Sequence, residues 1–391
     1  MSNTAGTVRT PLPVVLAGAR GHGRSHLLNI GRLERLGLVR LAGVCELRPL
    51  DAAELDGFDA TEQSSDFDAL MASTGARIAV ICTPIQTHAD LALTAARHGA
   101  HVLLEKPPAP SYAEFRRMAD GMAAAGVACQ IGFQSLGSHA VPAIRQVIES
   151  GGIGELLGVG AAGAWVRDEA YFRRAPWAGR RRLDGIDVVD GALTNPLAHA
   201  VATALALAGS SRAEDVEHVE AELLRANAIE ADDTSCVRIV TTAGTPLTVA
   251  ATLCAERDAE PYVVVHGSRG RITLWYRQDR VLLQRAGHGP EETVHGRTDL
   301  LENLVGHVTG AEPLRVPPEE TGAFMRVVEA IRLSPDPVAL PDAYWHTEPG
   351  ASGPRRVVDG IDGLVDTSAY SLSLYSELDA PWKLPTRAET P

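Results

Sequence analysis

The first third of the chain alternates short, continuously apolar runs with amphipathic stretches. The apolar runs predict strands covered on both faces, over residues 13–17, 39–45, 78–82, 101–104 and 128–133. The amphipathic stretches have helical spacing and predict helices near residues 25–36, 66–73, 87–98 and 112–125. Strands that alternate with helices predict right-handed βαβ units and a doubly wound parallel sheet.

The pattern changes after a predicted helix over residues 139–150. Strand-like runs separated by turn signals dominate up to about residue 284, which favours a large, mostly antiparallel sheet. Helical spacing returns at residues 196–208, 300–310 and 321–334. From about residue 335 the chain is rich in proline and glycine, and we expect an extended tail that packs back on the first domain.

The length and charge of the chain restrict its class. A chain of 391 residues exceeds one ordinary core, so we predict an α/β protein with two domains, residues 1–135 and 136–391. The net charge of −13 argues against nucleic acid and anionic membrane as partners. The polar N-terminus and the lack of an apolar run of about 20 residues predict a cytoplasmic protein.

The five cysteines, Cys45, Cys82, Cys129, Cys236 and Cys254, are widely spaced in apolar surroundings. This distribution is typical of small buried side chains. We predict no metal site, on the reasoning that the chain contains neither a Cys-x2-Cys nor a His-x3-His spacing.

A glycine-rich loop follows the first predicted strand and precedes a helix. Its residues, Gly18-Ala19-Arg20-Gly21-His22-Gly23, are typical of a turn that lets a pyrophosphate approach the helix N-terminus. The strict G-x-G-x-x-G pattern is not met, because Arg20 holds the second glycine position. Glycines also serve turn geometry alone, so the loop by itself is weak evidence for a dinucleotide.

The second strand ends in Glu46, which follows Gly18 by 28 residues. A carboxylate at this position accepts hydrogen bonds from both adenosine ribose hydroxyls and repels a 2′-phosphate. NAD is therefore the predicted cofactor. Arg20 and Arg48 could pair with a phosphate and keep NADP as the alternative.

The strand at residues 101–104 ends abruptly in Glu105-Lys106-Pro107. A lysine at the carboxyl end of a buried strand lies where open α/β sheets bind their ligands. Thr83, Pro84 and His88 follow the preceding strand and are expected at the same edge.

These motifs, together with His26, resemble those of the Gfo/Idh/MocA oxidoreductases. The resemblance implies a Rossmann domain followed by an α/β domain with a large sheet, and NAD(P)-dependent oxidation of sugar or cyclitol alcohols. It also implies that a second subunit covers the sheet, so we expect a homodimer or homotetramer. It assigns Lys106 to substrate and cofactor contact and His199 to acid–base catalysis.

The main departure from the family pattern is Asn195, which stands where an aspartate normally precedes the catalytic histidine by four residues. Asparagine can orient a hydroxyl but cannot raise the basicity of an imidazole as a carboxylate does. Branches with a segment like residues 171–179 carry asparagine here, so Asn195 does not imply an inactive protein. Asp184, Asp187 and Asp190 lie nearby in the sequence, and one of them could replace the carboxylate.

Three sets of candidate site residues follow. The catalytic candidates are Lys106, Asn195 and His199. The cofactor-binding candidates are Gly18, Arg20, Gly21, His22, Gly23, Glu46, Arg48, Thr83, Pro84, His88, Glu105 and Lys106. The substrate-binding candidates are Lys106, Gln134, Tyr171, Arg174, Trp177, Asn195 and His199.

The predicted function is hydride transfer between NAD and a secondary alcohol of a sugar, cyclitol or glycoside-like substrate. One alternative is a glycosidase or lyase that oxidises a ring carbon transiently and produces no net NADH. Another is a cofactor-binding protein without turnover, which the departures at Arg20 and Asn195 suggest.

Overall fold

The computed structural model describes residues 10–382 except 56, 59, 60 and 311, and it forms two compact units. The first unit comprises Met1–Ala109, Ala113–Gly132 and Asp299–Pro318. The second comprises Pro110–Tyr112, Phe133–Thr298 and Glu319–Pro391. The predicted boundary at residue 135 lies near this division, but the sequence did not indicate that residues 299–318 belong to the first unit.

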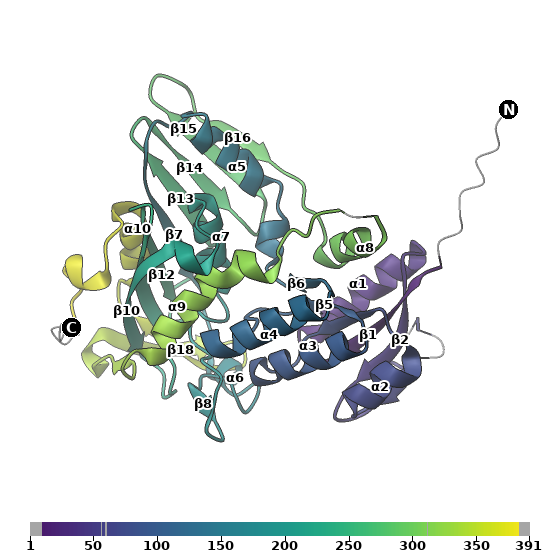
Figure 1. Cartoon of the computed structure of the whole chain (residues 1–391). Helices are drawn as coiled ribbons and strands as arrows, with labels where there is room; N and C mark the ends of the chain where they lie inside the picture. Colours follow the sequence, from purple (N-terminus) through teal and green to yellow (C-terminus); the bar gives the residue numbers. More distant parts are fainter. Residues whose placement is uncertain (1–9, 56, 59–60, 311, 383–391) are drawn as a thin grey trace. The chain divides into compact units, whose positions relative to one another are not determined.

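A six-stranded parallel sheet forms the centre of the first unit, in the order β3-β2-β1-β4-β5-β6 (Figure 1). Its strands are β1 Leu12–Ala17, β2 Val39–Cys45, β3 Glu62–Ser64, β4 Ile78–Ile81, β5 His101–Leu104 and β6 Cys129–Ile131. The order reverses between β1 and β4, which is where doubly wound sheets bind ligands. The prediction of this sheet is confirmed. The short edge strand β3 was missed because Glu-Gln-Ser carries no apolar signal.

The helices of the first unit lie close to the predicted ranges. They are α1 Gly23–Arg35, α2 Phe67–Thr74, α3 His88–Arg97, α4 Tyr112–Ala124, which begins at the boundary, and α8 Leu300–Gly310. The ends of α2 show how the sequence defines them. Asp66 caps its start by accepting a hydrogen bond from the Ala69 amide at 3.0 Å, and Gly75 ends it with φ +56°.

The buried Gln130 holds α8 in the first unit. Its side-chain oxygen accepts from the Val316 amide at 2.9 Å, and its amide group donates to Asn303 Oδ1 at 2.7 Å and to the Leu300 carbonyl at 3.2 Å. A buried amide satisfied in this way favours one arrangement of the chain, because an unpaired one costs about 1–3 kcal/mol.

A nine-stranded sheet, in the order β16-β15-β14-β13-β7-β12-β11-β10-β17, dominates the second unit. Its strands are β7 Leu156–Ala164, β10 Val216–Arg225, β11 Thr234–Thr241, β12 Pro246–Thr252, β13 Tyr262–Gly267, β14 Gly270–Trp275, β15 Arg280–Arg285, β16 Glu291–Val294 and β17 Val338–Ala339. Among the strand pairs described for this nine-stranded sheet, only β7–β12 and β10–β17 are parallel. The predicted large, mostly antiparallel sheet is therefore confirmed.

Helices and two small hairpins complete the second unit. The helices are α5 Ala140–Glu149, α6 Glu169–Phe172, α7 Ala198–Ala208, α9 Gly322–Leu333 and α10 Ile361–Ser371. The hairpins are β8 Arg182–Leu183 with β9 Ile186–Asp187, and β18 Trp345–Gly350 with β19 Gly353–Val358. The apolar helix α7 packs against β7 and β12. No helix in the part of the chain described here is long and apolar enough to cross a bilayer.

The tail after residue 335 differs from the prediction. It is not an extended loop on the first unit, because it forms the β18–β19 hairpin and then α10, which packs on β7 and β12 of the second unit (Figure 1, yellow). Val365, Ala369 and Tyr375 join Ala162 and Cys236 in one buried cluster. Three cysteines, Cys129, Cys236 and Cys254, are buried as predicted, whereas Cys45 and Cys82 are partly exposed.

A close approach between α10 and the sheet depends on Gly160 in β7. A Cβ atom added there would lie 1.9 Å from the Ala369 carbonyl oxygen. Nearby, the buried Tyr375 hydroxyl donates toward the carbonyls of Ser235 and Ala251, at 3.1 and 3.3 Å. The tail therefore buries this part of the sheet without a second subunit, and assembly into a homodimer or homotetramer stays a prediction.

We predict that Gly160→Ala lowers the free energy of unfolding by about 1–3 kcal/mol, because the added methyl group must displace the α10 backbone. Urea denaturation measures the loss, and limited proteolysis is expected to cut first in residues 350–382. Gly363→Ala is the matched control, because its Cβ would meet no atom within 4 Å. Equal stability of the two variants would contradict the proposed packing constraint.

Candidate functional site

The site of the first unit forms where parallel strands end. Gly18 follows β1, Glu46 follows β2, Thr83 lies just beyond β4 and Glu105 follows β5. These four positions lie at the carboxyl edge of the sheet, and the reversal of strand order between β1 and β4 falls among them.

Two of the loop glycines are required by packing. Gly18 has φ +81°, and a Cβ there would lie 2.5 Å from the Cys82 carbonyl oxygen. A Cβ at Gly23 would lie 1.9 Å from the Gly18 carbonyl oxygen. These are the first and third glycines of the dinucleotide fingerprint, so the loop keeps its geometry although Arg20 replaces the second glycine.

The loop also fixes the Glu46 carboxylate. Glu46 Oε1 accepts hydrogen bonds from the backbone amides of Ala19 and Arg20, at 2.6 and 3.1 Å. An acid anchored at the end of the second strand beside the glycine loop is the arrangement that recognises ribose hydroxyls.

The Arg20 side chain turns to neutralise Glu54. Its Nε and Nη2 donate to the two Glu54 oxygens at 2.9 Å each, and its guanidinium also donates to the backbone carbonyls of Arg48 and Pro49. The hydrogen bond from Arg20 lowers the pKa of Glu54. A surface hollow beside the loop is lined by Ala19, Arg20, Gly21, Arg24, Leu50, Asp51, Ala53 and Glu54. Arg20 is therefore committed to a carboxylate and less suited to a 2′-phosphate.

His88 ties two strand ends together. Its side chain is buried, with Nδ1 2.8 Å from the Pro107 carbonyl and Nε2 2.8 Å from the Thr83 carbonyl. Burial lowers the pKa of His88 despite these carbonyls, and a neutral imidazole can donate to only one of them at a time. Thr83 Oγ1 lies 2.7 Å from Thr87 Oγ1, and Pro84 begins the turn between them. We interpret His88 as a positioning residue for the two loops.

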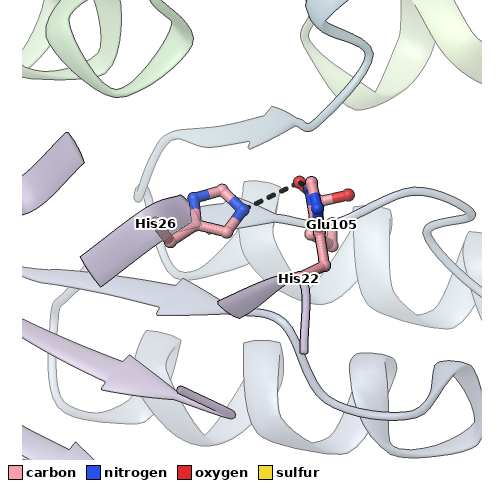
Figure 2. A group of neighbouring side chains, drawn as sticks. All are labelled: His22, His26 and Glu105. Atoms are coloured by element: carbon pink, nitrogen blue, oxygen red, sulfur yellow. Dashed lines mark hydrogen bonds and ion pairs between the residues drawn. The ribbon is translucent and has the colours of Figure 1, made fainter. Parts of the chain in front are cut away.

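The Glu105 side chain is buried just after β5, and the imidazoles of His22 and His26 lie beside its carboxylate (Figure 2). His26 Nε2 lies 2.8 Å and His22 Nε2 lies 3.5 Å from Glu105 Oε1. Burial alone would raise the pKa of Glu105, but hydrogen bonds from His22 and His26 outweigh it and hold the pKa well below its ordinary value. Glu105 Oε2 accepts from the Lys106 amide at 3.1 Å, so this ion shapes the turn that carries Lys106.

In the second unit, His199 lies near the start of α7 and contacts a relay of two hydroxyls. Its Nδ1 lies 3.2 Å from Ser135 Oγ, which accepts a hydrogen bond from Thr203 Oγ1 at 2.9 Å. The Phe133 ring packs edge-on against the imidazole, with centroids 5.6 Å apart. Thr203 follows His199 by four residues, a helical spacing that could have revealed it. Ser135 is 64 residues away and carries no such signal.

Asn195 lies just before the helix that carries His199, not on it. The helix begins at Ala198, after Pro196, so Asn195 occupies the preceding turn. Its Nδ2 donates to Asp190 Oδ1 at 2.6 Å. Asp190 is buried, and its other oxygen accepts from the Gly179 amide at 2.7 Å and pairs with Arg174 at 3.2 Å. Of the three aspartates that could replace the family's carboxylate, Asp190 is thus hydrogen-bonded to Asn195.

Tyr171, Arg174 and Trp177, three of the substrate-binding candidates, form one cluster. The Arg174 guanidinium carbon lies 3.8 Å from the Tyr171 ring centroid and 4.6 Å from that of Trp177. The Arg174 guanidinium thus makes cation–π contacts with both rings and an ion pair with Asp190, and these interactions hold the three side chains in place. Gln134 follows in the 3₁₀ helix Gln134–Gly137 of the second unit rather than at the end of a Rossmann strand.

Comparison with known proteins assigns the chain to a family. Residues 12–133 match the family described as "Oxidoreductase family, NAD-binding Rossmann fold", and residues 141–273 match "GFO/IDH/MocA C-terminal domain". The two matches together cover about two thirds of the chain. The chain belongs to the Gfo/Idh/MocA oxidoreductase family. The sequence-based recognition is confirmed, and with it the NAD-binding character of the first unit.

Individual relatives of this Gfo/Idh/MocA protein match it over only part of its length and at low sequence identity. Levoglucosan dehydrogenase of Pseudarthrobacter phenanthrenivorans is 27% identical over 161 residues, 41% of this chain and 39% of that protein. The NAD(+)-dependent scyllo-inositol 2-dehydrogenase of Bacillus subtilis is 30% identical over 92 residues, 24% of this chain and 27% of that protein. The chain thus matches less than half the length of these curated relatives.

Solved structures support the fold of the family. The WlbA dehydrogenase from Bordetella pertussis, solved with NADH and UDP-GlcNAcA, gives a TM-score of 0.68 at 22% identity and covers 82% of this chain and 95% of that one. The aldose-aldose oxidoreductase from Caulobacter crescentus gives a TM-score of 0.68 at 20% identity, over 82% and 96% of the two chains.

We predict that this Gfo/Idh/MocA protein binds NAD more tightly than NADP, because Glu46 repels a 2′-phosphate and Arg20 is paired. Glu46→Gln should shift the NADP-to-NAD affinity ratio toward NADP by about tenfold or more, from the loss of one close repulsion. Glu54→Gln should shift it in the same direction by releasing Arg20. Calorimetric titration measures both, and tighter NADP binding by the unmodified chain would refute the assignment.

We predict that Asp190→Asn lowers the free energy of unfolding by about 1–3 kcal/mol, because one carboxylate oxygen becomes an NH2 group that cannot accept, so the hydrogen bond from either Gly179 or Asn195 is lost. Asp187→Asn is the matched control. Asp187 pairs with Arg182 and Arg332 at 2.8 and 3.0 Å in a more exposed place, and its loss should cost under about 1 kcal/mol. Urea denaturation measures the loss of unfolding free energy in both variants. Equal losses would contradict the proposal that Asp190 organises this part of the second unit.

Proposed function

We propose that the protein is an NAD-dependent dehydrogenase that transfers hydride between the nicotinamide and a secondary alcohol carbon of a sugar-like or cyclitol-like substrate. The observation that carries this proposal is the imidazole of His199, held by a hydroxyl relay in the second domain of a family whose first domain binds NAD. Lys106 supplies a cationic donor at the edge where the first unit binds its ligand.

The proposed reaction moves one proton and one hydride. NAD, when bound, supplies the hydride acceptor. His199 Nε2 accepts the hydroxyl proton of the alcohol while the carbon loses its hydride, and the Lys106 ammonium stabilises the developing charge on the oxygen. For Nε2 to act as the base, Nδ1 must carry the ring proton and donate it to Ser135 Oγ. Ser135 can accept it, because a hydroxyl oxygen has a second lone pair beside the one used by Thr203.

Two features support a polyhydroxylated ring as the substrate. The Tyr171–Arg174–Trp177 cluster offers aromatic faces for stacking and guanidinium donors for hydroxyls. Asn195 adds an amide whose orientation is set by Asp190. The names of the relatives, a levoglucosan dehydrogenase and an inositol dehydrogenase, agree with this class.

The direct test is NAD reduction at 340 nm across a panel of sugars, anhydrosugars and cyclitols. We expect at least one substrate to give NADH in equal amount to the oxidised product. His199→Ala should lower turnover by about 10²-fold or more, in the range of a lost general base, while NAD binding is kept.

Three outcomes would oppose the proposal. Cleaved product without net NADH would indicate transient oxidation by a lyase or glycosidase. NAD binding without any turnover across the panel would indicate a binding protein. Near-normal turnover of His199→Ala would remove this imidazole from the reaction.

A further inference from the structure

His22, His26 and Glu105 form a compact cluster of ligand-type side chains (Figure 2). His22 occupies the N-cap position of α1 without a side-chain capping hydrogen bond. His26 follows it by four residues, so both imidazoles leave the same side of the helix. Glu105 reaches them from the end of β5. One ligand atom from each residue lies within 4.8 Å of the other two.

The cluster has the chemistry of a zinc site. Two imidazole nitrogens and one carboxylate oxygen are ligands that Zn²⁺ accepts, and His-x3-His on a helix is a spacing that zinc enzymes use. Bonds of about 2.0–2.1 Å in a tetrahedron place ligand atoms about 3.3 Å apart. The observed separations from Glu105 Oε1, 2.8 Å to His26 and 3.5 Å to His22, lie on either side of that value. Only a small opening of the His26 contact would admit an ion.

The burial of the three residues leaves one side of the site open. Glu105 and His26 are buried, whereas the His22 side chain is 60% exposed. On the exposed side, water would supply the fourth ligand, as in zinc sites with three protein ligands.

Two charges oppose a cation here. The Lys106 side chain follows Glu105 directly in the chain and is cationic, and the N-terminus of α1 carries a partial positive charge. We therefore expect binding weaker than at a closed structural site with four protein ligands. The prediction of no metal site rested on the supposed absence of Cys-x2-Cys and His-x3-His spacings, and it was mistaken about the second, because His22 and His26 form a His-x3-His pair.

We propose that His22, His26 and Glu105 bind one divalent cation of the zinc type when the dinucleotide is absent. Because His22 belongs to the glycine loop, an ion on it occupies the place where the loop receives a pyrophosphate. Ion and NAD should then exclude each other. This competition rests on the proposed use of the loop for NAD, whereas ion binding does not.

The test is calorimetric titration of the full, tag-free chain with ZnCl₂ in the absence of NAD. We expect one ion per chain, and His22→Leu should weaken its binding by about tenfold or more, since removing even an outer-shell partner can cost that much. His22 is exposed, so the variant should fold, and its melting temperature checks this. In the unmodified chain, saturating NAD should lower the apparent zinc affinity.

His346→Leu is the matched control. His346 is an exposed histidine that lies 2.8 Å from Asp359 and 3.2 Å from Glu348, and its loss should leave zinc binding unchanged. Three results would overturn the site without affecting the dehydrogenase proposal. They are no zinc binding by the unmodified chain, the same zinc affinity in His22→Leu as in the unmodified chain, and a loss of affinity in His346→Leu as large as in His22→Leu. Intact zinc binding that ignores bound NAD would overturn the competition alone. Should His22→Leu unfold, the visible spectrum of the Co²⁺-loaded wild type decides: bands of four-coordinate nitrogen and oxygen ligation support the site, and their absence refutes it.

Discussion

A carboxylate buried at the end of a central strand is stable only with partners, and Glu105 is such a group. Removing an ionised carboxylate from water costs several kcal/mol unless other groups compensate. His26, one turn into α1, and the Lys106 amide provide much of that compensation. The Glu105 carboxylate therefore links the glycine loop, α1 and the turn that carries Lys106. A change in the position of any one of them is expected to alter the other two.

The second unit uses the same principle around Asp190. This buried carboxylate receives the Gly179 amide, the Asn195 side chain and the Arg174 guanidinium. Asp190 thus orients both the aromatic cluster and Asn195. The sequence alone did not distinguish it from Asp184 and Asp187. In this chain the acid orients the Asn195 amide, while the His199 imidazole lies beside Ser135, which accepts a hydrogen bond from Thr203.

The sequence predicted most of the elements that build each sheet, because their burial leaves continuous apolar runs. It also predicted Glu46 and the outer loop glycines, because the carboxyl ends of neighbouring parallel strands meet at one edge of the sheet. Contacts between distant polar residues were not predictable. Ser135, Gln130 and the Arg20–Glu54 pair have no periodic signal. The tail was mistaken for a loop because its proline and glycine content concealed α10, whose apolar face matches the sheet through Gly160.

The most direct test of the site is a crystal structure of the protein with NAD. The adenosine ribose hydroxyls should lie within hydrogen-bonding distance of Glu46, with the pyrophosphate over the N-terminus of α1 and the Glu105–His26 contact intact. A dinucleotide bound away from Glu46, or a Glu105 side chain released from His26, would contradict the proposed organisation of the site.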